Sequence, residues 1–163
     1  MTKRTKRKFN LELEHSPARI VHAWLCFTGL ISHPAESAAC DKLAWPGFVN
    51  FMPESPDGLV VLTDTSGIYL GRSMRGRVFD KPSIQVRVRS AAIAEPEAWA
   101  KAAQIRKAFD RLVEPVRVIM QEDVTHTIQS ISISTPVTAL GRSRDTDRPN
   151  FSVNAFVVLA DEC

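Results

Sequence analysis

The stretch IQVRVRSAAIAEPEAWAKAAQIRKAFDRLV, residues 84–113, decides the fold class, because a strand pattern changes there into a helix pattern. Over residues 84–90 apolar side chains alternate with polar ones, which is typical of a strand with one buried and one wet face. Over residues 95–113 the apolar spacings of four, three, four and three predict a helix with one buried stripe, and Glu97 and Lys101 are expected to pair on its surface. The strand is predicted to bury Ile84, Val86 and Val88 and to expose Gln85, Arg87 and Arg89, and the helix to bury Ala98, Ala102, Ile105, Phe109 and Leu112.

An earlier helix is predicted to begin at Ser16-Pro17, because Ser is a good N-cap and Pro is tolerated at the first helical position. His33-Pro34 ends this helix at the latest. The small, polar residues 34–46 have room for a helical turn around Ala38 to Leu43. The predicted apolar stripe of the helix is Ile20, Trp24, Phe27 and Ile31.

Between these helices the chain reads WPGFVNFMPESPDGLVVLTDT, residues 45–65. Trp45 to Met52 is predicted to be extended, and the Pro and Gly residues that follow predict a turn. Leu59 to Thr63 is a continuous apolar run, which favours a strand in the interior of a sheet. Residues 64–82 are rich in Gly and Arg, and they indicate either a mobile loop or a long, irregular hairpin.

Three further strands are predicted after the second helix, at Val116–Met120, Thr125–Ser134 and residues 150–160. In the middle strand the isoleucines fall out of phase, so a bulge is expected near Gln129-Ser130. Residues 135–149 are expected to form a long polar loop. The last strand is predicted to place Phe151, Val153, Ala155, Val157 and Leu159 on one face.

These elements predict an α+β fold, in which a mostly antiparallel or mixed β-sheet packs against two main helices. The length of 163 residues and the apolar content of 44% fit one domain, over residues 11–163. No apolar run is long enough for a membrane span, and no secretory signal is recognisable. Three widely spaced cysteines fit thiols in a reducing compartment, so synthesis in a cytoplasm is expected.

The net charge of +3 belongs to the N-terminus rather than to the domain. Five basic residues between positions 3 and 8 stand without an acid, which leaves 16 basic against 18 acidic residues elsewhere. Residues 1–10 are therefore predicted to be a flexible basic arm that the fold does not need. Two roles stay open for it: a solubilising tail, or an arm that touches nucleic acid or an acidic partner.

No catalytic, cofactor or metal signature interrupts the chain. A zinc site from His22, Cys26, His33 and Cys40 is disfavoured, because the spacing matches no usual ligand pattern. The glycines at 67, 71 and 76 lack the Lys-Ser/Thr ending of a phosphate-binding loop. Carboxylates at strand ends, which are the places where nucleases hold magnesium, have no linking pattern here: Asp64, Asp80, Glu95 and Asp123.

The arginines are the main candidates for a binding surface. Arg87 and Arg89 share one strand face, and further arginines lie in the loops that flank the strands. They suit either phosphates or the carboxylates of a neighbouring subunit, but a solvated charged face stays open as the plainer reading. An RNA-binding sheet would need aromatic residues beside them, which this strand lacks. The residues predicted for a subunit or partner interface are Arg72, Arg75, Arg87, Arg89, Arg142 and Arg144.

Three segments together resemble the tail terminator proteins of long-tailed bacteriophages, also known as minor capsid or tail completion proteins. They are WPGFVNFMPESPDGLVVLTDTSG, then IQVRVRS with the helix containing AWAKAAQIRKAFD, and finally HTIQSISISTPVTALGRSRDTDRPNFSVNAFV. The likeness covers roughly residues 16–160 and lies in the order of the segments rather than in any catalytic motif. The loop TALGRSRDTDRPN is richer in arginine than the family pattern.

The resemblance implies a structural virion protein and no enzyme. Such proteins form a ring, usually a hexamer, on the head-proximal end of the tail tube, stop its polymerisation and present the surface that joins the head. The implied partners are further copies of the chain, the tail tube protein and the head-tail connector, and genomic DNA passes through the ring without sequence-specific binding. Assembly in the host cytoplasm is expected. The alternative is a nucleic-acid-binding accessory protein that uses the basic arm and the arginine face.

Overall fold

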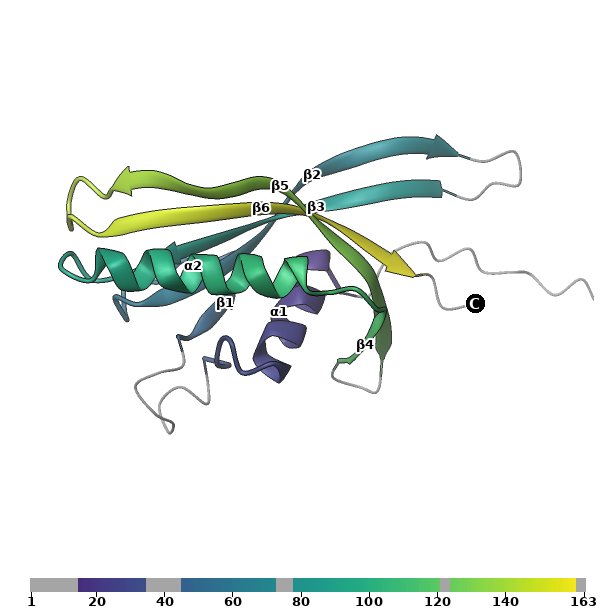
Figure 1. The fold of residues 1–163 in the computed structure, drawn as a ribbon, viewed down its shortest axis with the longest axis horizontal. Coiled ribbons are helices and arrows are strands. Elements are labelled where there is room, and N and C mark those ends of the chain that lie inside the picture. The colour runs from purple at the N-terminus through teal and green to yellow at the C-terminus, as the bar shows by residue number, and fades with distance from the viewer. Residues whose placement is uncertain (1–14, 35–44, 73–77, 121–123, 161–163) are drawn as a thin grey trace, which may run out of the picture.

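The strand and helix patterns fold into one mixed, curled sheet with both helices on the same face (Figure 1). The computed structural model describes residues 15–34, 45–72, 78–120 and 124–160. The described strands form one sheet in the order β1-β2-β3-β6-β5-β4, and only β1 and β2 run parallel. The α+β prediction is therefore confirmed. The elements are α1 Pro17–Phe27, β1 Gly47–Val49, β2 Leu59–Arg72, β3 Val78–Arg89, α2 Glu95–Asp110, β4 Val116–Ile119, β5 Thr125–Arg142 and β6 Pro149–Ala160.

Residues 64–82 were expected to form either a mobile loop or a long, irregular hairpin. The described part of this segment forms the hairpin. β2 and β3 pair antiparallel out to Arg72 and Val78, with register shifts after Thr65 and after Tyr69. Gly67 is required in this hairpin, because a Cβ there would lie 2.3 Å from the backbone oxygen of Lys81. The paired outer halves extend past the helices as an arm (Figure 1). We call residues 65–72 and 78–83 the β2–β3 arm.

The predicted polar loop over residues 135–149 is wrong, because β5 continues to Arg142 and pairs with β6. Proline normally ends a central strand, but the register shifts between Thr135 and Thr138, which takes Pro136 out of the regular ladder. Only residues 143–148 turn between the two strands. The bulge predicted near Gln129-Ser130 is confirmed, since the register shifts between Ile128 and Ser130.

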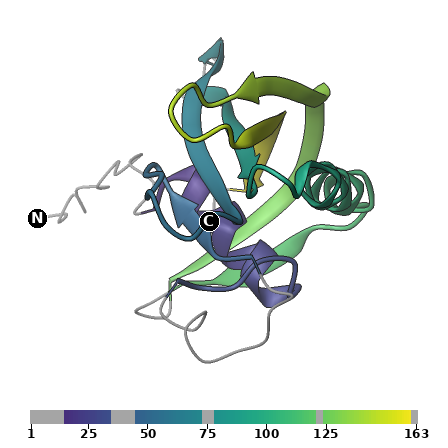
Figure 2. The same cartoon turned by 90° about the vertical axis from the view of Figure 1, so that its left-hand side faces the viewer.

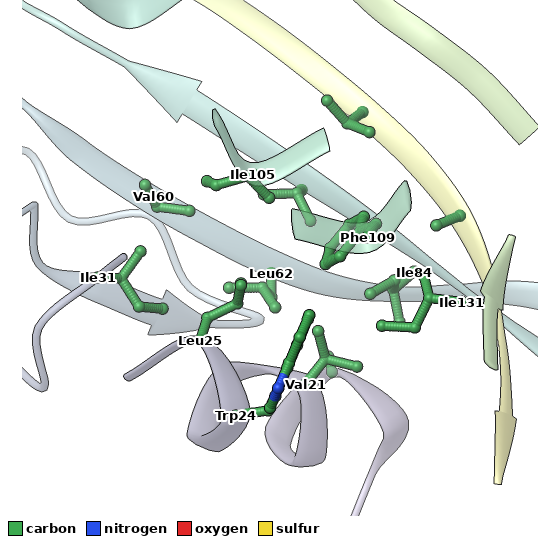
Figure 3. Packing of buried hydrophobic residues seen from close by; sticks show 14 of the residues in the cluster. Val21, Trp24, Leu25, Ile31, Val60, Leu62, Ile84, Ile105, Phe109 and Ile131 are labelled. Atoms are coloured by element: carbon green, nitrogen blue, oxygen red, sulfur yellow. The ribbon is translucent and has the colours of Figure 1, made fainter. Parts of the chain in front are cut away.

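Both helices bury their stripes against the same sheet face (Figure 3). Trp24 of α1 stacks on Phe109 of α2, with ring centroids 6.0 Å apart. Both helices therefore share one core, to which the sheet contributes Val60, Leu62, Ile84, Val86, Val88, Val153, Ala155 and Val157.

Phe27 is not part of the stripe of α1, contrary to prediction, and 89% of it is exposed. The helix ends at Phe27, and Gly29 takes a φ of 73°. The chain reverses there and returns Ile31 to the core from outside the helix. The helical spacing thus continued in the sequence past the point where the helix stops.

The predicted surface pair of Glu97 and Lys101 is also wrong. Lys101 is buried, and its Nζ donates to the backbone oxygen of Leu30 at 2.9 Å. Burial lowers the pKa of Lys101 below its usual range. The lysine thereby fastens α2 to the segment that follows α1, which the helix pattern alone did not indicate.

Three predictions lie outside the described residues: the helical turn around Ala38 to Leu43, and the flexible state and the role of the basic arm. Neither α1 nor α2, the helices of the described residues, has the length and hydropathy of a membrane-spanning helix. Turned by 90°, the sheet is seen to curl, with the strands bending around the side away from α2 (Figure 2). Arg87 and Arg89 of β3 alternate with core residues, so they lie on the sheet face that the helices do not cover.

Candidate assembly interface

Arg89 departs from the predicted wet face, because only 7% of it is exposed. Its Nη2 donates to the backbone oxygens of Pro53 and Pro56 at 2.8 Å and of Glu54 at 3.0 Å. The loop of residues 50–58 folds over this part of β3, so the arginine satisfies carbonyls that face no other strand. Burial lowers the pKa of Arg89, and the positive charge of Arg148 lowers it further.

A second arginine ties this loop to the turn between β5 and β6. Arg148 donates to the backbone oxygen of Glu54 at 2.8 Å and forms an ion pair with Asp57 at 2.5 Å. Arg89 at the end of β3 and Arg148 in the β5–β6 turn thus fix the loop of residues 50–58 from two places that are distant in sequence. The loop is short for a connection between the parallel strands β1 and β2, and these clamps hold it in place.

Arg142 joins the same turn to the start of α2. It forms ion pairs with Glu95 at 2.5 Å and with Asp147 at 3.2 Å. The hydrogen bond that Arg142 donates to Glu95 is the main cause that raises the pKa of Arg142. All three side chains are well exposed, so these pairs contribute little to stability, but they orient Arg142.

A pocket of about 380 Å³ opens between the loop of residues 50–58 and the β5–β6 turn. Among the described residues that line it, three are arginines and none is Asp or Glu. Arg87 lies partly buried in this pocket, and its Nε is buried without a hydrogen-bond partner. We call this site the arginine pocket, and its lining is Met52, Arg87, Arg89, Leu140, Gly141, Arg142, Ser143, Thr146 and Asn150.

The structure brings together Arg87, Arg89 and Arg142 of the six arginines predicted for an interface. Arg144 is exposed in the neighbouring turn and does not line the pocket. Arg72 ends β2 at the far end of the β2–β3 arm, and Arg75 lies outside the described residues. No sequence pattern indicated Met52 or Asn150, because the folding of residues 50–58 over the sheet places Met52 beside the arginines and the pairing of β3 with β6 places Asn150 there.

The histidines and cysteines considered for zinc do not form a site in the described part of the chain. His22 Nε2 donates to the backbone oxygen of Gly47 at 2.9 Å, and burial lowers the pKa of His22. Cys26 Sγ lies 3.8 Å from that nitrogen, and Cys40 is outside the described residues. No group of three metal-binding side chains occurs in residues 15–34, 45–72, 78–120 and 124–160. His22 thus serves to join α1 to β1.

The candidate carboxylates are likewise apart from one another. Asp64 accepts hydrogen bonds from the backbone N–H of Ala18 and from Asn50 Nδ2, at 2.8 and 2.9 Å. Glu95 pairs with Arg142, as described above, and Asp123 is outside the described residues. Asp80 is exposed on the β2–β3 arm. Their contacts are those of structural or surface side chains.

Several large apolar side chains are exposed in the monomer. Ile68, Tyr69 and Leu70 follow one another on the β2–β3 arm, with exposed fractions of 46%, 66% and 56%. Val113, just after α2, is 86% exposed. Such side chains at protruding positions are typical of protein contact surfaces.

The fold and these surfaces can be set beside known proteins. A family model described as bacteriophage tail terminator protein matches residues 32–159. This chain belongs to the bacteriophage tail terminator family. The match includes all six described strands and α2, and it confirms the resemblance found in the sequence. Comparison with the sequences of curated proteins gives no match.

Tail terminator proteins are structural components of the phage tail, and this places the chain in the virion tail. The arginine pocket and the β2–β3 arm both lie within the matched residues. The basic arm and α1 precede them.

Proposed function

We propose that this tail terminator protein caps the head-proximal end of the tail tube, stops its polymerisation and forms the surface that joins the head. The observation that carries the proposal is the family match over residues 32–159, which spans nearly the whole described fold. A homo-oligomeric ring, expected to be a hexamer, would perform this role. The tail tube protein and the head-tail connector would be its other partners.

The β2–β3 arm supports an assembly role. Its strands hydrogen-bond to each other beyond the region where the helices cover the sheet (Figure 1). Three consecutive apolar residues, Ile68, Tyr69 and Leu70, stay exposed there, which a monomer gains nothing from. Burial against another subunit or against the tube would remove this apolar surface from water.

The two ends of the molecule differ, and this fits a ring. One end has the arginine pocket, and the other has the β2–β3 arm and the connection between α2 and β4 (Figure 1). Contacts between unlike surfaces run head to tail and close into a ring when the rotation allows. In such a ring genomic DNA would pass through the centre without sequence-specific contacts.

The nucleic-acid alternative loses one of its residues in the structure. Arg89 donates to backbone oxygens of its own chain and is buried, so it is not presented to a phosphate. The remaining basic groups of the alternative are the exposed arginines and the basic arm. No contact in the described residues favours this function over tail assembly.

Light scattering and electron microscopy together test the proposal. The purified protein should have a mass well above the 18.1 kDa monomer, either alone or after it is mixed with tail tubes. Gold-labelled protein should appear at one end of each tube and not along its length. Binding all along the tubes, or a monomer that binds DNA in a salt-sensitive manner and ignores tubes, would contradict the proposal.

A further inference from the structure

The charged side chains that line the arginine pocket are all cations. Its charged lining consists of Arg87, Arg89 and Arg142, and no Asp or Glu of the described residues lines it. Arg142 is paired with Glu95 and Asp147 at the rim, and Arg89 is occupied by backbone oxygens. Arg87 has only a long contact to Gln85, at 3.4 Å, while its buried Nε donates to nothing. The guanidinium of Arg87 therefore has the weakest hydrogen bonding of the three arginines, and an acceptor that enters the pocket would stabilise its charge.

The shape and lining favour a protein carboxylate as the acceptor. A carboxylate accepts charge-assisted hydrogen bonds from a guanidinium, and its negative charge complements the three arginines of the lining. Met52 and Leu140 stand beside the arginines, so the occupant also needs an apolar part. A duplex presents a convex row of phosphates and no apolar side chain, and it does not reach a buried Nε in a pocket of about 380 Å³.

Glu114 is the carboxylate of this chain that fits these needs. It lies in the short connection between α2 and β4, where Val113, Glu114 and Pro115 are all exposed. The structure gives Glu114 no ion pair within the described residues. Val113 is 86% exposed beside it and supplies the apolar part.

Other exposed carboxylates fit less well. Glu97 and Asp145 lie at the same end of the molecule as the pocket, on the first turn of α2 and in the β5–β6 turn. Asp80 lies within a strand of the β2–β3 arm, opposite Tyr69 in the ladder, and not on a short connection. Among the described residues, Glu114 is the carboxylate that directly follows an exposed large apolar residue on a connection between two elements.

Glu114 cannot reach the pocket of its own subunit. Glu95, at the start of α2, binds Arg142 on the pocket rim, and Glu114 follows the end of this helix. Sixteen residues with a rise of about 1.5 Å each separate the two ends of α2 by about 24 Å. Only a second copy of the chain can bring Glu114 to Arg87.

We propose that Glu114 of one subunit enters the arginine pocket of the next subunit and binds Arg87, with Val113 against Met52 and Leu140. This inference rests on the proposed ring and names a contact that closes it. The pocket and Glu114 lie at opposite ends of the domain, so the contact is head to tail and repeats around the ring. The interface would remove both charges from water, and either charge without its partner would then be unfavourable. The contact is therefore selective for subunits in the orientation that pairs Arg87 with Glu114.

A charge swap tests the contact. Arg87→Glu and Glu114→Arg should each abolish ring formation, measured as particle mass by light scattering in the presence of tail tubes. The double variant, with both changes, should form rings again, because the pair is restored with its charges exchanged. Each single variant should lose at least tenfold in ring affinity.

Matched controls separate this contact from general charge effects. Glu97→Arg matches Glu114→Arg but lies at the other end of α2, and Arg144→Glu matches Arg87→Glu but lies beside the pocket and outside its lining. Both controls should form rings like the wild type. Circular dichroism should show that Glu114→Arg, a change at an exposed connection, keeps the fold, so the test stands even if Arg87→Glu does not fold.

Two outcomes would overturn the contact. Rings of normal mass and affinity from Glu114→Arg would show that Glu114 is not the occupant, and the proposed function would be unaffected if those rings still cap tubes. Failure of both single variants without rescue in the double variant would also reject the pairing. If the wild type forms no ring even on tubes, the proposed function and the contact both fail.

Discussion

At the scale of single residues, buried cations shape this protein more than its surface charges do. Arg89 and Lys101 look exposed in the sequence because they alternate with, or lie opposite to, apolar positions. In the structure each donates to backbone oxygens of a distant segment, Arg89 to residues 53–57 and Lys101 to Leu30. Long basic side chains can bury their stems in this way, and sequence periodicity does not reveal it.

Arg89→Ala should destabilise the domain. The change removes the side-chain donor of the Pro53 and Pro56 backbone oxygens and leaves the Glu54 oxygen to Arg148 alone. Buried groups of this kind cost about 1–3 kcal/mol each when unsatisfied, and water entry reduces the sum, so we expect a loss of about 2–4 kcal/mol. Urea melts would measure it, with the exposed Arg144→Ala as the control that stays within about 0.5 kcal/mol.

This expectation replaces the simpler one from the sequence, in which both arginines of β3 could be reversed without harm to folding. Arg87→Glu alone should affect mainly assembly, whereas Arg89→Glu should already unfold part of the domain. Equal stability of the Arg89→Ala variant and the wild type would show that the loop holds without the arginine.

Phe109→Ala should cost about 3–5 kcal/mol, from lost burial and the cavity left behind. Phe109 is fully buried at the centre of the α2 stripe and stacks on Trp24 (Figure 3). Phe27→Ala removes the same side chain from an exposed position and should change the free energy of unfolding by less than about 0.5 kcal/mol. Similar urea midpoints for the two variants would contradict the core assignment.

His22 should make the fold less stable in mild acid. Burial lowers its pKa in the folded state below the ordinary value of 6.5, so the unfolded chain binds the proton more readily. The contribution of neutral His22 is complete above pH 6.5 and is lost as the pH falls towards the folded pKa. His22→Gln keeps a donor for the Gly47 oxygen and should flatten the fall in stability below pH 6.5. An unchanged slope in pH-dependent melts would contradict this.

At the scale of elements, helices and strands with periodic apolar patterns were predicted correctly, and segments without such a pattern were missed. Both helices, the bulge near Ser130 and the last strand follow from period and phase, which local side-chain patterns encode. The outer half of β5 was taken for a loop, because Pro136 and polar residues conceal a strand whose partner, β6, is supplied only by the fold. Part of the arginine pocket was predictable, because the alternation of side chains in β3 places Arg87 and Arg89 on one face. The loop of residues 50–58 completes the pocket, and its position depends on the tertiary fold.

The β2–β3 arm should serve assembly and not folding. Tyr69 and Leu70 are more than half exposed, so changing both to Asp should leave the thermal midpoint of the monomer nearly unchanged. The same change should abolish ring formation or tube binding, since charge would replace apolar contact. Gln104→Asp, at an exposed position of α2, is the control. A variant with Asp at both arm positions that still caps tubes would place the interface elsewhere.

At the scale of the whole molecule, the domain has unlike ends joined by one sheet. One sheet, packed against a core that both helices share, connects the β2–β3 arm with the strands that line the arginine pocket (Figures 1 and 3). Fixed, dissimilar ends are what a head-to-tail ring requires. The family supplies the setting of this ring, the phage tail, and the structure supplies the surfaces from which it can be built.

Arrest of tube growth tests the central claim most directly. Tail tubes would be incubated with this protein, supplied with fresh tube subunits of the same phage, and their lengths measured by electron microscopy. The account predicts that tubes stop lengthening once about one ring is bound per tube, while untreated tubes and tubes given the double Asp variant of Tyr69 and Leu70 continue to grow. Tubes that bind the wild-type protein and still lengthen at the untreated rate would contradict it.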